Sequence, residues 1–469
     1  MSIRTTIPVL VFLLVTVRAF AQSAPASPDR PWHSADEQQI KNTSKPSLIS
    51  RFSIEPNRTY TLAELVNLAE EHNPETRVVW ETARAQMAAL GIARSELYPT
   101  VAAVALSQTS RSEILFGSQF YRQTVQEFAG EFDLTYTIID FGGRAGRIGA
   151  ARADLLAANF AFNDTHRKII YDVAQAYYQL LDAAGQEEAA RASLKNARSV
   201  EQAAEDRLKN GLATLPDVLE ARSAVAQSQY ELQAALGAEK NSRGDLATAL
   251  GTRPTDTIQV QAIDQLVIPE SIGDSVDQAI DRAFEQRPDL MQQVAEIRRA
   301  NASVKEAHSA FYPALYLAVG PDVESLYGLQ QQLPWSHTAD LTGGLNLSLH
   351  WTLFDGGARK QNLARAQANL RAAEAQVRVT HNEIADEVWR AYSNVETSLR
   401  QRQAAAALLL AADQSYSAAL ESYNDGVRNL LDVTAAQRTL AQARSLDVLA
   451  RTQVLSNLSG LAFQSADLI

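Results

Sequence analysis

The sequence predicts a mainly helical protein with a small β part, built as two tandem copies of a unit that runs helix, two strands, long helix, helix. Three observations predict this class. The 469-residue chain matches itself at a nearly constant offset. It is rich in Ala, Gln, Glu, Arg and Leu, while aromatic residues reach only 7%. Two segments of about ten residues alternate between apolar and polar side chains, which is typical of strands.

The repeat depends on landmark residues at fixed spacing. One set of matches lies 214 positions apart and comprises Pro74 with Pro288, Tyr98 with Tyr312, and Pro99 with Pro313. A second set lies 215 positions apart and includes Asp140 with Asp355, Gly211 with Gly426, and Asp217 with Asp432. The one-residue difference falls between residues 99 and 134, in a polar stretch that we expect to be a loop.

The repeat also predicts the domain organisation. We expect, in chain order, a signal peptide over 1–21, a polar linker over 22–58, a first repeat over 59–251, a linker over 252–273 and a second repeat over 274–469. The strands are expected at about 100–140 and about 314–354, and the turns between long helices at about 210–217 and about 424–432.

The first residues resemble a secretory signal peptide. Arg4 provides the basic start, an apolar run extends from Ile7 to Val17, and Ala19-Phe20-Ala21 offers a cleavage site near Ala21. A buried N-terminal helix or anchor is the alternative, although a run of about eleven residues is too short to span a bilayer. No later stretch of the sequence is apolar for 18 residues, so we expect strands to make any membrane crossing.

Composition excludes several function classes. The chain contains no Cys, which excludes disulfides, thiolate metal sites, Cys nucleophiles and lipid attached to Cys. None of its seven His is paired at metal-ligand spacing, and no catalytic signature is present, so we predict no metal, no cofactor and no enzyme. The net charge of −11 argues against nucleic acid as a partner.

Each unit begins with helices. Amphipathic segments start near Leu62 and Val276 and break at Pro74 and Pro288, and a second helix then runs to Tyr98 or Tyr312, where the next proline ends it. A strand follows over 100–109 or 314–319, and loops are expected over 111–126 and 324–341.

The cleanest strand pattern comes after these loops. The apolar residues alternate with polar ones at Phe132, Leu134, Tyr136 and Ile138, and at Leu345, Leu347, Leu349, Trp351 and Leu353. Such a strand suits a barrel wall between lipid and water, but a half-buried strand of a soluble sandwich has the same pattern. Four strands cannot close a barrel alone. A membrane barrel would therefore need two, three or four copies of the chain, and three copies give twelve strands.

Long helices follow the strands. Each extends for about 65 to 70 residues, from Asp140 to Gly211 and from Asp355 to Gly426, which corresponds to roughly 100 Å. A return helix of about 35 residues follows each turn, so the two shorter helices of a unit could line the long one end to end. Gly143, Gly146 and Gly149, at the start of the first long helix, favour close packing over phosphate binding.

The turns between long helices are the candidate functional sites. Glycine allows the left-handed exit from a helix, and Thr214 can cap the first return helix. They are either simple helix hairpins or docking sites. Apolar residues on a turn that needs none favour docking. The predicted contact residues are Gly211, Leu212, Leu215, Gly426, Val427 and Leu430.

These landmarks resemble the TolC-type outer-membrane factor family. The resemblance rests on the Tyr-Pro pairs, on the run Leu-Ser-Leu-His-Trp-Thr-Leu-Phe-Asp-Gly-Gly from Leu347 to Gly357, and on the Gly-to-Asp spacing of both turns. It implies a homotrimer with a twelve-stranded β-barrel in outer-membrane lipid, joined to a periplasmic coiled-coil tunnel. It also implies a passive exit duct of a tripartite efflux or type I secretion system, with a periplasmic adaptor protein and an inner-membrane pump as partners.

The resemblance further implies a gate at the periplasmic end of the tunnel. Tyr423 and Arg428 resemble gate residues of the second hairpin, Asp217 their acceptor on the first, and Asp432 an aspartate ring. Ala435 stands where the best-known members carry a further Asp, which predicts weaker block by cations. The alternative to a channel is a soluble periplasmic coiled-coil scaffold, which would need no alternating strands.

Overall fold

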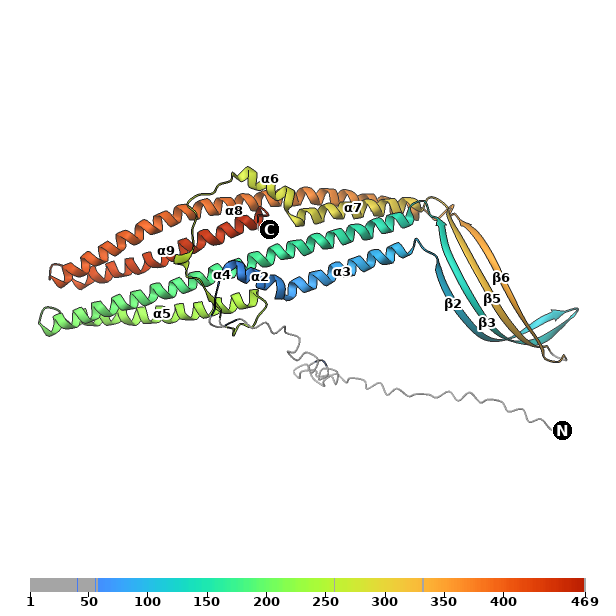
Figure 1. Cartoon of the computed structure of the whole chain (residues 1–469), viewed down its shortest axis with the longest axis horizontal. Coiled ribbons are helices and arrows are strands. Elements are labelled where there is room, and N and C mark those ends of the chain that lie inside the picture. The colour runs from blue at the N-terminus through green and yellow to red at the C-terminus, as the bar shows by residue number, and fades with distance from the viewer. Residues whose placement is uncertain (1–39, 41–54, 56–57, 257, 331–332, 468–469) are drawn as a thin grey trace, which may run out of the picture. The chain divides into compact units, whose positions relative to one another are not determined.

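The computed structural model describes residue 40, residue 55 and residues 58–467 except 257, 331 and 332. The chain divides into two units, Met1–Ser53 and Ile54–Ile469, and the elements below belong to the second (Figure 1). The signal peptide expected over 1–21 and almost all of the linker expected over 22–58 lie outside the described residues.

Two helices precede the strands in each repeat. They are α2 (Leu62–His72) and α3 (Pro74–Ser95) in the first repeat, and α6 (Val276–Gln286) and α7 (Pro288–Ser309) in the second. The breaks occur at the expected prolines, which occupy the first turn of α3 and α7, where a missing N–H costs nothing. Thr61 with Glu64, and Ser275 with Gln278, form capping boxes that begin α2 and α6.

The long helices have the predicted lengths. α4 (Gly143–Lys209) and α8 (Ala358–Asn424) each contain 67 residues, and the return helices α5 (Leu215–Ala249) and α9 (Leu430–Gln464) each contain 35. α4 packs against both α3 and α5, and α8 packs against both α7 and α9. Figure 1 shows that α3 and α5 lie along opposite halves of α4, which confirms the end-to-end arrangement.

Contacts of α4 join the two repeats. α4 packs against α7 at its strand end and against α9 nearer the turn. A Cβ added to Gly146 would lie 2.8 Å from the backbone nitrogen of Glu306, so this glycine lets α4 and α7 approach closely, as predicted. Around the hairpins the neighbouring helices therefore follow the order α8, α9, α4, α5, with α8 and α5 at the margins.

The segment between the repeats contains only short elements. β4 (Gln259–Val260) pairs in parallel with β1 (Thr59–Tyr60), and the short 3₁₀-helix η2 (Ile263–Gln265) follows. The described part of the chain contains no helix that is both long and apolar enough to cross a membrane.

A four-stranded antiparallel sheet connects the helices. Its order is β2 (Thr100–Phe116), β3 (Gln119–Ile139), β5 (Ala314–Gln330) and β6 (Ser336–His350), and β3 with β5 joins the two repeats. The loops predicted over 111–126 and 324–341 are wrong, because the paired strands run through most of both segments and β2 turns directly into β3 at Gly117-Ser118. Trp351 and Leu353 lie beyond β6, and the Trp351 indole instead donates to the carbonyl of Phe311 at 3.2 Å.

The same local motif leads from the sheet into each long helix. The Asp140 carboxylate accepts the backbone N–H of Arg144, and the Asp355 carboxylate accepts that of Arg359 at 3.0 Å. Each arginine also donates to a carbonyl just before the aspartate, at 3.2 Å in both repeats. Gly142 and Gly357 take the left-handed conformation, with φ of 104° and 90°, that this corner requires.

A charged cluster around two buried arginines ties α4 and the middle of α8 to the start of α7 and the end of α9. Arg287 donates to both carboxylate oxygens of Asp289, to Glu387 at 2.7 Å and to Gln464 at 3.0 Å. Arg167, only 2% exposed, donates to the carbonyl of Phe463, and burial lowers the pKa of its guanidinium. The cluster therefore fixes the C-terminal end of α9 against α4, α7 and α8.

Candidate functional site at the two helical turns

The first turn links α4 to α5. Gly211 takes a φ of 72°, and the N–H of Leu212 donates to the carbonyl of Arg207 at 2.8 Å, closing the end of α4. The Asp217 carboxylate accepts both the N–H and the hydroxyl of Thr214 at 2.7 Å, so Thr214 begins α5 as predicted. These two bonds, first the backbone and then the hydroxyl, hold the pKa of Asp217 below its usual value.

The second turn links α8 to α9 in a similar way. Gly426 takes a φ of 80°, and the N–H of Val427 donates to the carbonyl of Ser422 at 2.8 Å. Here the cap is Asn429, whose side chain accepts the N–H of Asp432 at 2.9 Å. Within the described residues the Asp432 carboxylate makes no hydrogen bond or ion pair, which leaves its charge available at the turn.

Arg207 connects the two hairpins. Its Nη1 donates from α4 to the carbonyl oxygens of Tyr423 at 2.5 Å and Asn424 at 3.2 Å, both at the end of α8. The guanidinium carbon also lies 4.7 Å from the centre of the Tyr423 ring. We call these contacts the Arg207 bridge. It places a cation at the negative end of α8, where it adds a charged donor to the last carbonyls of the helix.

Tyr423 is buried beside this bridge, with 3% of its surface exposed. Burial raises the pKa of its hydroxyl, nearby Arg207 acts in the opposite direction, and the charge of Asp217 raises it further. Tyr423 and Asp217, two of the predicted gate residues, are therefore close enough to interact electrostatically. The Tyr423 hydroxyl has no hydrogen-bond partner among the described residues.

Arg428 behaves differently from this pair. It is exposed, and only its backbone N–H is engaged, with the carbonyl of Ser422 at 3.1 Å. Within the described residues its guanidinium makes no ion pair, and the Asp217 carboxylate is occupied by Thr214. The roles assigned to Asp217, Tyr423, Arg428 and Asp432 stay predictions.

The ends of both hairpins share one apolar core. It contains Val200, Ala204, Val218, Ala221, Tyr416, Ala419, Tyr423, Leu430 and Val433, contributed by all four helices. One of these residues corrects the sequence analysis. Leu430, expected to be exposed at the turn, is only 3% exposed, because α9 begins there with this side chain facing the core. The exposed residue is the next one, Leu431, at 67%.

The other predicted apolar residues are exposed at the turns. Leu212 and Leu215 expose 66% and 58% of their surface on the first turn, and Val427 exposes 80% on the second. Gly211 and Gly426 provide the left-handed backbone that forms the two turns. With Leu431, each turn therefore carries two exposed aliphatic side chains, which is typical of a surface that meets a partner.

Sequence reasoning did not find Arg207. The repeat gives no hint, because the residue 215 positions later is Ser422. The available signal was weaker: Arg207 is a basic residue in the last turn of a helix. Such a residue favours interaction with the carbonyls at a helix end, but the sequence does not indicate which helix provides them. The described residues also contain no cluster of His, Asp or Glu that could hold a metal ion.

Comparisons with known proteins agree with this architecture. The family model described as "Outer membrane efflux protein" matches residues 65–252 and 279–464, one segment in each repeat. Protein CyaE of Bordetella pertussis is 28% identical over 87% of this chain and 84% of its own length. Outer membrane protein OprJ of Pseudomonas aeruginosa is 25% identical over 81% of this chain and 78% of its own.

A solved structure shares the fold. The outer-membrane channel OprN superposes with a TM-score of 0.76, covering 90% of this chain and 95% of OprN, at 19% identity. The family match covers most of the chain, and the resemblance seen in the sequence is confirmed. The chain belongs to the outer membrane efflux protein family, and it is an outer-membrane efflux channel.

Proposed function

We propose that three copies of the chain form a passive exit duct, with a twelve-stranded barrel in the outer membrane and a helical tunnel in the periplasm. The open sheet carries this proposal. β2 and β6 each pair on one side only within the described part of the chain, so each leaves a row of backbone groups unpaired. Lipid cannot satisfy these groups, whereas pairing β2 of one copy, 17 residues long, with β6 of the next, 15 residues long, satisfies nearly all of them.

The surface of the sheet supports a lipid contact. Phe132 in β3 is 60% exposed, and Leu345, Leu347 and Leu349 in β6 are 73%, 58% and 66% exposed. In water these exposed apolar side chains would be unfavourable, and in a bilayer they are the expected outer face of a strand.

The helices support the same closure. The hairpin layer has α5 and α8 at its two margins, as the sheet has β2 and β6 at its two edges. α5 and β2 belong to the first repeat and α8 and β6 to the second, so margin and edge correspond. α8 also exposes large apolar residues away from its own neighbours, including Trp389 at 57% and Leu410 at 63%. A neighbouring copy that covers them would close the sheet and the helical layer together.

At the turns we propose a gate and a docking surface. Arg428, Asp217 and Tyr423 form the closing contacts between hairpins, Asp432 forms a ring of negative charge, and the Arg207 bridge holds the two hairpins of one copy together. Leu212, Leu215, Val427 and Leu431 contact a periplasmic adaptor protein, and through it an inner-membrane pump. The N-terminal segment directs export as a signal peptide cleaved near Ala21, and no catalytic step is involved.

Planar-bilayer recording tests the gate. If Arg428 and Asp217 close the tunnel, Arg428→Ser and Asp217→Ala raise single-channel conductance, because each removes a charge-assisted contact of roughly 1 to 3 kcal/mol. Arg298→Ser, a change at an exposed arginine of α7, which α4 and α8 of the same copy flank, is the matched control and leaves conductance unchanged. Equal conductance in the wild type and in both gate variants would reject the assignment.

The family assignment favours this channel over the soluble periplasmic scaffold considered from the sequence. In a soluble scaffold, an open four-stranded sheet with exposed apolar side chains would be unfavourable in water.

A further inference from the structure

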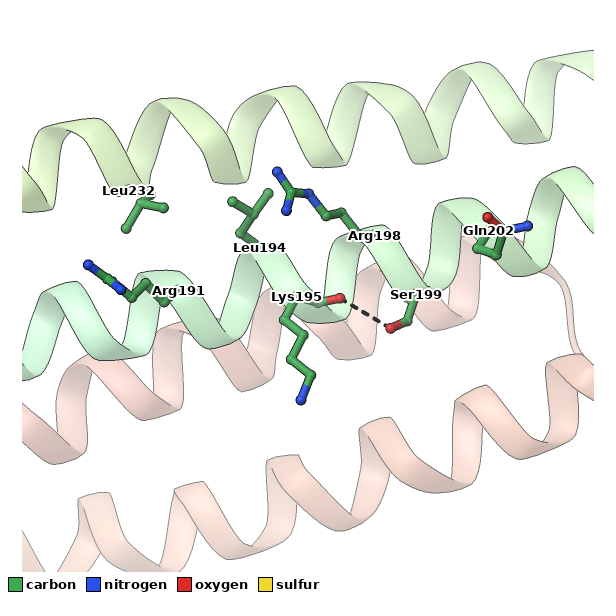
Figure 2. A pocket seen from close by; sticks show the side chains of 7 residues that line it. All are labelled: Arg191, Leu194, Lys195, Arg198, Ser199, Gln202 and Leu232. Atoms are coloured by element: carbon green, nitrogen blue, oxygen red, sulfur yellow. Dashed lines mark hydrogen bonds between the residues drawn. The ribbon is translucent and has the colours of Figure 1, made fainter.

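A basic groove lies on α4 and α5, about halfway along the first hairpin. Arg191, Lys195 and Arg198 follow one another at spacings of four and three residues, so they project from one face of α4. Figure 2 shows Leu194 on α4 and Leu232 on the adjacent α5 between Arg191 and Arg198, while Lys195 points away from α5. The groove has a volume of about 660 Å³ and continues past Ser199 to Gln202.

The charge of this groove is largely uncompensated. Arg191 pairs with Glu187 at 2.5 Å, but the side chains of Lys195 and Arg198 have no acidic partner within the described part of the chain. The whole chain carries a net charge of −11. A local cluster of unpaired cations on an acidic protein attracts an acidic ligand rather than stabilising its own fold.

The floor of the groove is apolar. Leu194 is 7% exposed, and Leu232 is half-buried beside it. The stems of Arg191 and Arg198 add aliphatic surface around this floor, and Lys195 adds its charge at the edge that faces away from α5. A ligand that fits must therefore combine an apolar stripe with acidic groups at helical spacing, which describes an acidic amphipathic helix.

The groove faces the outside of the helical layer. On the other side of α4, the helices α4, α5 and α9 surround a separate hollow whose α4 lining is Gln186, Ala189, Ala190 and Ser193. At 3.6 residues per turn, this lining and the basic face point about 160° apart on α4. Because α5 and α9 both lean toward the hollow, that side becomes the inside when the layer closes into a tunnel. The basic face is then the outer one.

We propose that this groove binds an acidic amphipathic helix of a partner protein outside the tunnel. The inference rests on the proposed function, because a periplasmic tunnel is what exposes this face to a partner. Carboxylates at positions i, i+4 and i+7 of the partner helix would meet Arg191, Lys195 and Arg198. An aliphatic residue at i+3 would pack on Leu194 and Leu232.

Fluorescence anisotropy of the full-length protein in detergent tests the groove. The probe is a labelled stapled helix with Glu at i, i+4 and i+7 and Leu at i+3, and its reference is the same helix with Gln in place of Glu. We expect the Glu helix to bind more tightly than the Gln helix. The double variant Lys195→Glu with Arg198→Glu should weaken binding of the Glu helix at least about tenfold, and added salt should do the same.

The matched control is Arg298→Glu with Lys305→Glu, two exposed basic residues of α7 for which the described residues provide no ion pair. This variant should retain binding. Equal affinity for both helices, or equal loss in both double variants, would overturn the proposal. A basic-groove variant that no longer assembles would identify a second copy of the chain as the occupant of the groove. Altered ion selectivity in bilayers would place the groove inside the pore. Either result would also overturn the proposal. A groove variant that conducts normally but no longer binds the Glu helix supports the proposal. If the wild type conducts but does not bind the Glu helix, the groove proposal is wrong and the proposed channel function is unaffected.

Discussion

Replacing Arg207 by Met removes the Arg207 bridge while keeping an unbranched side chain of similar length. The variant loses the donor to the carbonyls of Tyr423 and Asn424, at 2.5 and 3.2 Å, and the cation 4.7 Å from the Tyr423 ring. A hydrogen bond from a charged group contributes about 1.5–3 kcal/mol, and an exposed cation–π contact about 0.5–1 kcal/mol. Since one guanidinium makes both contacts, the terms do not simply add, and we expect a loss of about 2 kcal/mol.

The loss should appear at the end of α8, whose carbonyls the bridge stabilises. The N–H groups of Asp425, Gly426 and Val427 close this helix by bonds to Glu421, Tyr423 and Ser422. A loss of about 2 kcal/mol raises the population of the opened turn about 30-fold. Hydrogen–deuterium exchange of peptides covering this turn should accelerate by up to that factor, because exchange follows local opening.

Lys209→Met is the control for this experiment. Lys209 lies two residues after Arg207, is 69% exposed, and within the described residues pairs only with Asp206 of its own helix. Exchange at 425–427 should be unchanged in this variant. If Arg207→Met also leaves exchange at 425–427 unchanged, the bridge does not stabilise the second turn and our reasoning about the site is wrong.

Three further predictions concern local stability. Thr214→Ala should destabilise the start of α5 by about 1 kcal/mol, seen as faster hydrogen–deuterium exchange there. Because the pKa of Asp217 in the folded protein is depressed below 3.8, the stabilisation of α5 by this carboxylate is present at neutral pH and is lost as the pH falls below that value. Asp217→Asn should abolish this loss of stability at acid pH. Arg287→Met removes the charged partner of Asp289 and Glu387, whose side chains are 32% and 44% exposed, and should cost about 1–3 kcal/mol by thermal melting. Arg390→Met, whose pair with Asp386 is exposed, should cost at most about 1 kcal/mol. Gly146→Ala should lower the free energy of unfolding by about 1–3 kcal/mol, because the added methyl group would clash with Glu306. Gly237→Ala should raise it by about 0.5–1 kcal/mol, because nothing lies within 4 Å of the added methyl group. A change of the same sign in both variants would contradict the packing of α4 on α7.

The helical part of the fold could be predicted from the sequence because its limits carry strong local signals. Pro74 and Pro288 start helices, and Gly211 and Gly426 end them, as the repeat indicates. The extent of the strands could not be predicted. The stretch of β2 from Ser110 to Glu113, just past the predicted strand, is polar on both faces, so the alternation that marks a half-buried strand is absent there. Only pairing with β3 makes it a strand.

The site was predictable at the turns themselves but not between them. Exposure of Leu212, Leu215 and Val427 follows from a turn that projects from its helices. Leu430 and Leu431 were confused because one residue of helix rotates a side chain by about 100°. Arg207 and Tyr423 are 216 residues apart, and their contact depends on how α4 packs against α8 and α9, which no local pattern encodes.

Native mass spectrometry of the detergent-extracted protein tests most directly whether the sheet is completed by sister copies. We predict a single species of three chains that dissociates on heating, because one chain leaves β2 and β6 unpaired on their outer sides within the described residues. A stable single chain that retains its strands in lipid or detergent would contradict the account.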